Sequence, residues 1–201
     1  MKKVKDHYFH KAKSDGFVAR SAYKLEELDK KFRLFSSGKR VLDLGCFPGS
    51  WMQFISSKVG NKGLVYGIDR TLLQIHMKEN MKFLQSDIFL LEADASLFQT
   101  KFDLICSDMA PNSTGIKSVD AERSFELCLK ALEIARIALK TKGNFVVKAF
   151  QGTTLDRLIS LVRSEFYQTK SFKPNSSRNE SRELFVVGIG KKGHTTNIEE
   201  E

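Results

Sequence analysis

Short apolar runs recur along the chain and predict buried strands. Five of these runs carry β-branched or aromatic residues and are four to eight residues long. They cover residues 40–46, 63–69, 81–85, 101–108 and 143–150. Two later runs, at 167–172 and 183–190, are expected to pair as an antiparallel hairpin that closes the sheet.

Helical spacing of apolar residues separates these runs. It predicts a basic amphipathic helix within residues 19–32, a helix after residue 50, and helices at 121–139 and 155–166. Gly143 is expected to stop the helix before it, and Thr153 or Thr154 to cap the next one. Strands alternating with helices over this length predict a mostly parallel, doubly wound α/β sheet.

The length of 201 residues suits one domain, so we expect residues 1–201 to form a single unit. Residues 1–16 read as a loose basic arm and residues 193–201 as a loose acidic tail. No stretch approaches the roughly 18 apolar residues that a membrane-spanning helix needs, and no apolar run follows the N-terminal charges. Membrane insertion and secretion are therefore not expected.

Cysteine and histidine usage predicts neither a disulfide framework nor a metal site. Cys46, Cys106 and Cys128 are odd in number, form no Cys-x-x-Cys pair and have apolar neighbours, so we expect reduced, buried thiols. The four histidines are scattered without metal-ligand spacing. A reducing, intracellular compartment fits best, and the cytoplasm, the nucleus and an organelle such as the mitochondrion remain open.

The formal net charge of +9 is concentrated near the two ends of the chain. Residues 1–40 hold twelve Lys/Arg against five Asp/Glu, whereas residues 41–162 hold fourteen against thirteen. Residues 163–198 add seven basic and three acidic residues before the final three glutamates. Two basic segments that flank a neutral middle indicate a polyanion as partner, with nucleic acid as the leading candidate.

A glycine-rich turn with two carboxylates behind it predicts a nucleoside-binding site. The first strand runs into a Gly-x-x-x-Gly turn from Gly45 to Gly49, which is neither the dinucleotide fingerprint nor a Walker sequence. A nicotinamide-dependent oxidoreductase is therefore disfavoured. Asp69 ends the second strand, where a carboxylate can accept from ribose hydroxyls, and Asp87 follows the third strand. Either acid alone would also suit a turn, but together they fit S-adenosylmethionine, with Asp69 on the ribose and Asp87 near the base amine.

A lysine inside an apolar strand marks a second candidate site. Lys148 lies in the run 145–150, and a buried ammonium group needs partners or an exit at the strand end. Asp108 ends the neighbouring strand, so the two side chains are expected to meet at the ligand-binding edge. The pair can serve as general base and orienting carboxylate, and a purely structural ion pair is the alternative.

Five segments of the sequence resemble the FtsJ-like (RrmJ-like) ribose 2'-O-methyltransferases. The resemblance covers nearly all of residues 6–191. Ser181-Arg182-Glu183, shortly after the fifth segment, also matches. One departure is Cys46-Phe47, where two alanines are usual, but it removes no functional group. The segments are residues 19–25 (Ala-Arg-Ser-Ala-Tyr-Lys-Leu), 42–51 (Leu-Asp-Leu-Gly-Cys-Phe-Pro-Gly-Ser-Trp), 107–112 (Ser-Asp-Met-Ala-Pro-Asn), 145–148 (Phe-Val-Val-Lys) and 173–178 (Lys-Pro-Asn-Ser-Ser-Arg).

The resemblance implies a fold, a reaction and a set of site residues. The fold would be the Rossmann-like one of class I S-adenosylmethionine-dependent methyltransferases, a seven-stranded sheet whose last strand is antiparallel. The family's Lys-Asp-Lys-Glu tetrad falls on Lys24, Asp108, Lys148 and Glu183, with Lys148 as the expected base and Glu183 holding Lys24 or the ribose. The implied cofactor contacts are Gly49, Trp51, Asp69, Asp87 and Asp108, together with Gly45 and Pro48 of the same turn.

RNA is the expected partner, because a ribose 2'-hydroxyl exists only on RNA. The expected product is a methylated ribose in large-subunit ribosomal RNA, free or in a ribosomal particle, made by a monomer that needs no metal. A tRNA anticodon-loop enzyme and a non-catalytic RNA-binding assembly factor are the alternatives. The alternative role for the aromatic residues of the arm is to attach it to the core. The candidate RNA contacts are Lys11, Lys13 and Arg20 on one wall and Lys173, Arg178 and Arg182 on the other.

Overall fold

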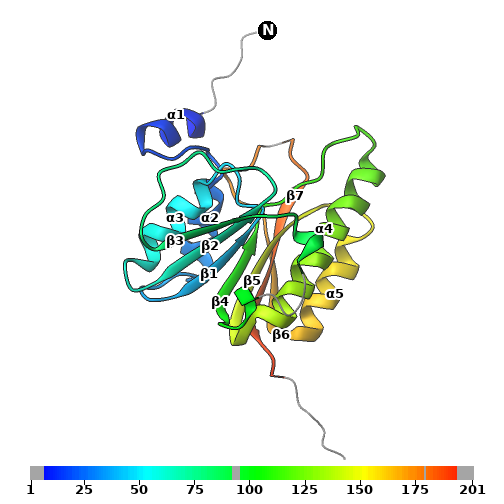
Figure 1. Cartoon of the computed structure of the whole chain (residues 1–201). Helices are drawn as coiled ribbons and strands as arrows, with labels where there is room; N and C mark the ends of the chain where they lie inside the picture. Colours follow the sequence, from blue (N-terminus) through cyan, green and yellow to red (C-terminus); the bar gives the residue numbers. More distant parts are fainter. Residues whose placement is uncertain (1–6, 92–95, 179, 194–201) are drawn as a thin grey trace, which may run out of the picture.

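The computed structural model describes residues 7–91, 96–178 and 180–193. Within these residues one sheet holds seven strands (Figure 1). Most of the predicted acidic tail and the first six residues of the predicted arm lie outside the described residues. The strands are β1 (Arg40–Leu44), β2 (Leu64–Asp69), β3 (Met81–Gln85), β4 (Phe102–Ser107), β5 (Leu139–Phe150), β6 (Phe166–Phe172) and β7 (Glu183–Lys191).

The strand order is β3-β2-β1-β4-β5-β7-β6, so the last strand of the chain lies inside the sheet. Strands β1 to β5 pair in parallel, whereas β7 is antiparallel to both β5 and β6. The expected α/β fold, the pairing of the last two runs and the antiparallel last strand are confirmed.

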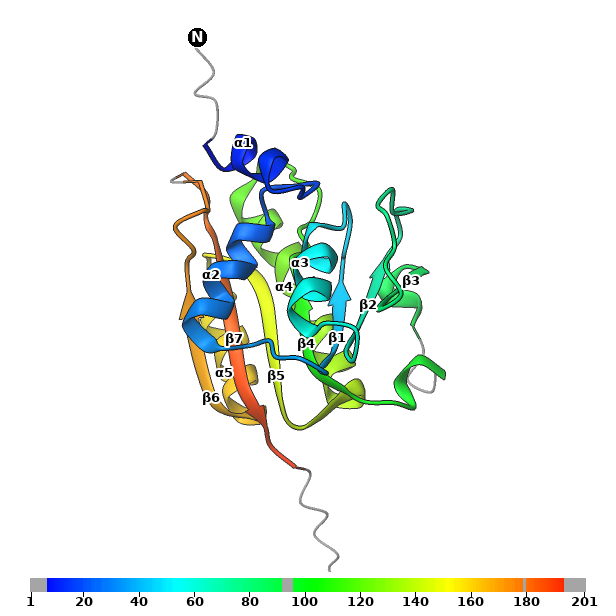
Figure 2. The ribbon, with the colours of Figure 1, turned by 90° about the vertical axis from the view of Figure 1, so that its left-hand side faces the viewer.

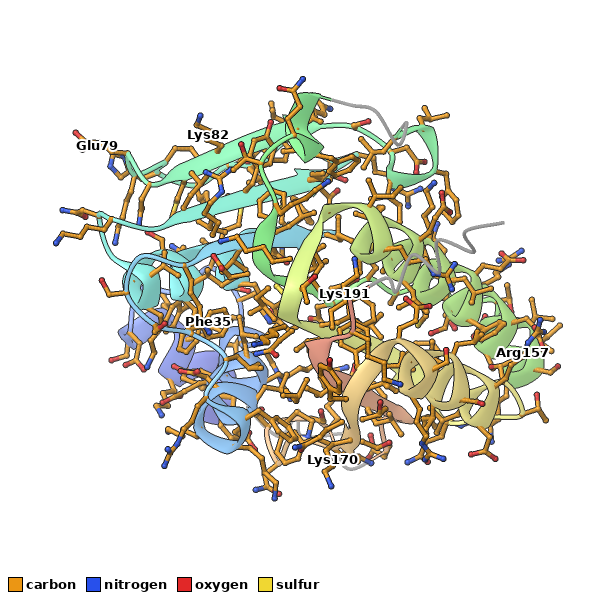
Figure 3. All side chains as sticks on the ribbon, turned by 90° about the horizontal axis from the view of Figure 1, so that it is seen from below. Phe35, Glu79, Lys82, Arg157, Lys170 and Lys191 are labelled. Carbon is orange, nitrogen blue, oxygen red and sulfur yellow. The ribbon has the colours of Figure 1, made fainter. Side chains whose placement is uncertain are left out.

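Helices cover both faces of the sheet. Seen from below, α2 and α3 lie on one side and α4 and α5 on the other (Figure 3). None of the described helices is long and apolar enough to cross a membrane. The helices are α1 (His7–Ser14), α2 (Ala22–Phe32), α3 (Ser50–Val59), α4 (Lys117–Ala138) and α5 (Leu155–Glu165), with short 3-10 helices at Ile88–Leu90 and Ser96–Phe98.

The two faces of the sheet carry separate apolar cores because side chains alternate along each strand. Leu42 and Leu44 of β1 pack with the residues of α4 and α5, whereas Val41 packs with those of α2 and α3. The same alternation divides Val186 from Val187 in β7. The core residues include all three cysteines, which are free and buried as expected.

The start of the chain is more ordered than its polar sequence suggests. Residues 7–14 form α1, which we expected to be part of a loose arm. The Tyr8 ring lies 5.5 Å from that of Tyr23 in α2, and Ala12 is buried. The expectation was wrong because these contacts, and not a continuous apolar face, attach α1 to the fold. Figure 2 shows α1 at the end toward which β1 points.

Gly143 and Thr154 do not have the roles at helix ends that the sequence predicts. Helix α4 ends at Ala138 and β5 begins at the next residue, so Gly143 stands inside a strand and does not stop the helix. The register between β4 and β5 shifts here, and a Cβ on Gly143 would lie 2.8 Å from the Leu139 side chain. Gly143 therefore serves a β-bulge. Thr154 occupies the N-cap position of α5, but its side chain makes no capping hydrogen bond.

Candidate active site

A cavity of about 510 Å³ lies where β1, β2, β3 and β4 end. The strand order runs outward from β1 to β3 on one side and from β4 to β5 on the other. In an open parallel sheet, ligands bind in the crevice that such a reversal creates. The cavity wall includes Gly45, Asp69, Asp87 and Asp108, which the sequence singled out.

Backbone amides orient the two carboxylates that were predicted for a nucleoside. The Asp69 oxygens accept hydrogen bonds from the N–H groups of Phe47 and Thr71, at 3.0 and 2.7 Å. Asp87 Oδ1 accepts from the N–H of Phe89 at 3.0 Å, which caps the first 3-10 helix. A carboxylate has about four lone-pair sites, so both acids can still accept hydrogen bonds from a ligand.

The glycine-rich turn places one of its residues in the cavity wall. Gly45 has a φ of 74°, and a Cβ there would lie 2.1 Å from Met109 Cγ. Pro48, Gly49 and Trp51 do not line the cavity. The Trp51 indole is 3% exposed, donates to the Ser21 carbonyl at 2.8 Å and packs against the Phe185 ring. Trp51 thus joins α3 to α2 and β7, and its contact with a cofactor stays a prediction.

Four charged side chains converge beside the cavity, three from α2, β5 and β7 and one from the residue that follows β4. Lys148 Nζ lies 2.9 Å from Asp108 Oδ1 and donates a hydrogen bond to the Asp108 carbonyl oxygen. Lys24 Nζ lies 2.5 Å from Glu183 Oε1 and 4.0 Å from Asp108 Oδ1. The predicted meeting of Asp108 with Lys148 is confirmed, and the carboxylate stands between two ammonium groups.

The charge state of Glu183 follows from its surroundings. Burial alone raises the pKa of this carboxyl group, but the hydrogen bond and the charge of Lys24 outweigh burial. Its pKa therefore lies below the ordinary value, and Glu183 is ionised at neutral pH. Both lysines of the cluster are largely buried, at 9% exposed for Lys24 and 7% for Lys148. The cluster is therefore held rigidly by the fold.

Sequence reasoning missed Asp43, a further carboxylate near the site. Asp43 lies in β1 and is 1% exposed, and its Oδ2 atom has no hydrogen-bond partner among the described residues. Burial, followed by the charges of Asp108 and Asp69, raises its pKa well above the ordinary value. The available signal was an acid inside the apolar run Val-Leu-Asp-Leu, the same kind of signal that pointed to Lys148.

The six predicted RNA contacts differ in how the structure uses them. Arg20 donates to the Ser176 carbonyl at 2.5 Å and Lys173 to that of Ser181 at 2.8 Å, so both hold the loop 173–182. Burial, and then the charge of Arg178, lowers the pKa of Arg20. Arg182 bonds to the Gln151 carbonyl, Lys11 lies 4.6 Å from the Tyr23 ring centroid, and Lys13 and Arg178 are exposed.

Glu27 of α2 holds the same loop from the other side. Its two carboxylate oxygens accept from the N–H groups of Asn175 and Ser176, at 2.7 and 2.8 Å. Because Lys24 lies one helical turn away and contacts Glu183, α2 positions both the loop and the charged cluster. In the part of the chain that the structure describes, no group of three or more His, Cys, Asp or Glu side chains could hold a metal ion.

Comparison with known proteins identifies the family. The profile of the FtsJ-like methyltransferases matches residues 17–191. A relative named ribosomal RNA large subunit methyltransferase E, from Desulfatibacillum aliphaticivorans, is 47% identical over 190 residues, 94% of this chain and 92% of its own. A relative of the same name from Bdellovibrio bacteriovorus is 44% identical over 192 residues, with coverages of 94% and 97%.

A solved structure agrees with the sequence relatives. The crystal structure of a chain described as a ribosomal RNA methyltransferase of Plasmodium falciparum superposes with a TM-score of 0.79 at 30% sequence identity. The match covers 88% of this chain and all of the other. With a profile that spans the sheet and the charged cluster, and relatives that match nearly end to end, this chain belongs to the FtsJ-like methyltransferase family.

Proposed function

We propose that this protein transfers a methyl group from S-adenosylmethionine to a ribose 2'-hydroxyl in large-subunit ribosomal RNA. The observation that carries the proposal is the Lys148–Asp108 pair, 2.9 Å apart, because Asp108 also lines the cavity. A basic side chain is thus placed between a small-molecule cavity and the loop 173–182, which carries Lys173, Arg178 and Arg182.

The charge of the cavity wall suits this cofactor. The wall holds four carboxylates and two guanidinium groups, although the chain as a whole carries +9. S-adenosylmethionine supplies an electrophilic methyl group on a positively charged sulfur. Asp69 would accept from the ribose hydroxyls and Asp87 would lie near the base amine, while the Gly45 backbone borders the cavity. The charged residues are Asp69, Asp87, Asp108, Glu126, Arg70 and Arg123.

The remaining step is the removal of one proton. The ribose 2'-hydroxyl must lose its proton as its oxygen attacks the methyl group, so an acceptor has to lie beside it. Lys148 Nζ is the group placed to accept that proton, and it can do so only after the ammonium group has released a proton of its own to solvent. Asp108 orients Lys148 because its carbonyl oxygen and its carboxylate both lie within hydrogen-bond distance of Nζ. Glu183 holds Lys24, and Lys24 in turn lies near the Asp108 carboxylate as a second cation beside Lys148.

The relatives support ribosomal RNA as the substrate. Those named above are ribosomal RNA large subunit methyltransferases that match this chain over nearly its full length. This support disfavours the tRNA anticodon-loop alternative. The intact Lys24, Asp108, Lys148 and Glu183 cluster disfavours an assembly factor without catalytic activity. RNA would lie against Lys11, Lys13, Arg20, Lys173, Arg178 and Arg182.

We extend the proposal to the form in which the protein acts. One sheet joins the first strand to the last, which supports a single methyltransferase domain. A lysine base needs no metal, so we propose that the activity is independent of metal ions. We also propose that the protein acts as a monomer. The bacterial relatives support the cytoplasm over the nucleus or an organelle. Sedimentation tests whether the protein is a monomer, and the resistance of the activity to chelators tests whether it needs a metal.

Methyl transfer from labelled S-adenosylmethionine tests the function. The acceptors are unmodified large ribosomal subunits, their free RNA and bulk tRNA, and the modified nucleotide is mapped in any product. We expect a single 2'-O-methyl mark in large-subunit RNA. A synthetic RNA that carries hydrogen in place of the mapped 2'-hydroxyl should bind and yield no product. Methylation of tRNA alone would overturn the substrate, and methylation of a base would overturn the reaction.

A further inference from the structure

Two exposed phenylalanine rings lie in the cavity wall. Phe47 is 50% exposed and Phe89 is 52% exposed, and both belong to the lining. Other large apolar side chains are exposed elsewhere, such as Leu72 at 59% and Leu90 at 77%, but these two do not line the cavity. Single exposed apolar residues are ordinary, whereas two rings among convergent carboxylates have the composition of a ligand site.

The same carboxylates that were assigned to the nucleoside fix the backbone of each ring. The N–H of Phe47 donates to Asp69 Oδ2, and the N–H of Phe89 donates to Asp87 Oδ1, both at 3.0 Å. The position of each ring is therefore tied to that of its carboxylate. A small molecule that binds Asp69 and Asp87 in this cavity therefore also lies close to the two rings.

The sheet topology separates the two rings. Phe47 follows β1 and Phe89 follows β3, while Asp69 ends β2, which lies between these strands. The rings thus come from the two strand ends that flank the ribose carboxylate. A nucleoside offers flat faces to rings and hydroxyl and amine groups to carboxylates, which this wall matches.

We propose that Phe47 and Phe89 form two aromatic walls that enclose the adenosine part of the methyl donor. This inference rests on the proposed function, since it takes S-adenosylmethionine as the ligand. Stacking on the base or the sugar face strengthens binding of the nucleoside and does not involve the charge on sulfur.

Calorimetry with S-adenosylmethionine and S-adenosylhomocysteine tests the proposal. The variants are Phe47→Ala and Phe89→Ala, with Leu72→Ala and Leu90→Ala as matched controls that remove exposed apolar side chains outside the cavity wall. We expect each phenylalanine variant to raise both dissociation constants by the same factor, about 3- to 30-fold. The controls should stay within about twofold. Phe47→Tyr and Phe89→Tyr, which keep the rings, should bind as the wild type does.

The comparison of the two ligands separates the outcomes. They share the adenosine, but only one is a sulfonium, so a loss confined to S-adenosylmethionine would place the rings beside the sulfur and overturn the inference. Weaker binding of RNA with unchanged binding of both small ligands would also overturn it. If the wild-type protein bound neither ligand, the proposed cofactor itself would fail. Binding by the wild type with unchanged binding by both alanine variants would refute the aromatic walls alone.

Discussion

At the scale of single residues, the proposed mechanism depends most on Lys148, whose Nζ atom would have to hold a fixed position and exchange a proton. The fold meets the first demand by burying the side chain and bonding Nζ to the Asp108 carbonyl. Lys24 lies 4.0 Å from the same carboxylate, so Asp108 keeps a cationic neighbour when Lys148 is replaced. Variants at this position are therefore expected to fold.

Replacing Lys148 tests the proton transfer. Lys148→Ala should lower the methyl-transfer rate by at least about 100-fold, the usual effect of losing a general base. Lys148→Arg should do no better, because a guanidinium group stays protonated. Calorimetry with the cofactor and filter binding with RNA serve as controls and should match the wild type. Near-normal turnover of Lys148→Arg, measured where chemistry limits the rate, would mean that the residue acts as a fixed positive charge.

Asp43 gives a prediction for stability as a function of pH. Its pKa is raised in the folded chain, so between the ordinary value of 3.8 and the raised value the native state keeps a proton that the unfolded chain releases. Stability then falls as pH rises through this window, by up to about 1.4 kcal/mol per pH unit. Asp43→Asn removes this term, so its stability relative to the wild type should increase from pH 5 toward pH 8 in urea unfolding.

Asp103→Asn is the control, because the pKa of Asp103 is shifted in the opposite direction to that of Asp43. Burial works against ionisation of Asp103, but the Arg40 N–H and the Lys140 ammonium group lower its pKa below 3.8. Its contribution is therefore lost only in acid and is constant between pH 5 and pH 8. Parallel stability curves for the wild type and Asp43→Asn over that range would contradict the raised pKa of Asp43.

At the scale of elements, lysines from other parts of the chain complete the end of α4. The Lys191 ammonium group is buried and donates to the carbonyls of Ala135, Arg136 and Leu139. Lys101 donates to the Ile137 carbonyl at 2.8 Å but is exposed. The last carbonyls of a helix lack partners within it, and here β7 supplies one. Figure 3 shows Lys191 at the end of the molecule that is seen from below.

The burial of this contact makes it testable. Lys191→Met keeps the apolar length of the side chain but leaves buried carbonyls unpaired, so we expect a loss of about 1–3 kcal/mol in the free energy of unfolding. Lys101→Met removes an exposed contact and should cost less than about 1 kcal/mol. Urea titration of both variants provides the measurement. Equal losses would show that the carbonyls at Lys191 find water or other partners.

Elements whose apolar pattern is local were predictable from the sequence. The strands lie within one or two residues of the expected runs, apart from β5, which begins at Leu139 because the chain enters it without a turn. The Asp108–Lys148 contact followed from the rule that adjacent parallel strands end at one edge. Lys24 and Glu183 came only from the family resemblance, because nothing local links residues 159 positions apart. Helix α1 was missed because its contacts come from Tyr23.

At the scale of the whole molecule, the formal charge of +9 overstates what the active-site edge presents to RNA. Several lysines donate to backbone carbonyls at the opposite edge. Lys39 donates to the Leu34 carbonyl, just after α2, and Lys192 to those of Arg163 and Ser164 at the end of α5. Lys13 and Arg178, in contrast, are exposed at α1 and in the loop 173–182. The location of a cation therefore matters more for RNA than the total count.

The salt dependence of RNA binding distinguishes the two groups of cations. The double variant Lys13→Ala/Arg178→Ala should weaken binding and flatten the plot of log affinity against log salt by about one to two units of slope. The double variant Lys101→Ala/Lys192→Ala removes the same charge at the opposite edge and should leave the slope unchanged. Equal flattening by the two variants would mean that RNA responds to net charge and not to this surface.

The order of strands also governs when the protein can become active during its synthesis. Strand β7 is the last described strand to leave the ribosome, yet it lies between β5 and β6 and brings Glu183 to Lys24, a residue made near the beginning. Until β7 emerges, β6 has no neighbour in the sheet, the edge of β5 is open, and Lys24 lacks its carboxylate. A chain that lacks β7 therefore cannot assemble the charged cluster. The proposed methyl-transfer site is thus complete only once translation has passed this strand.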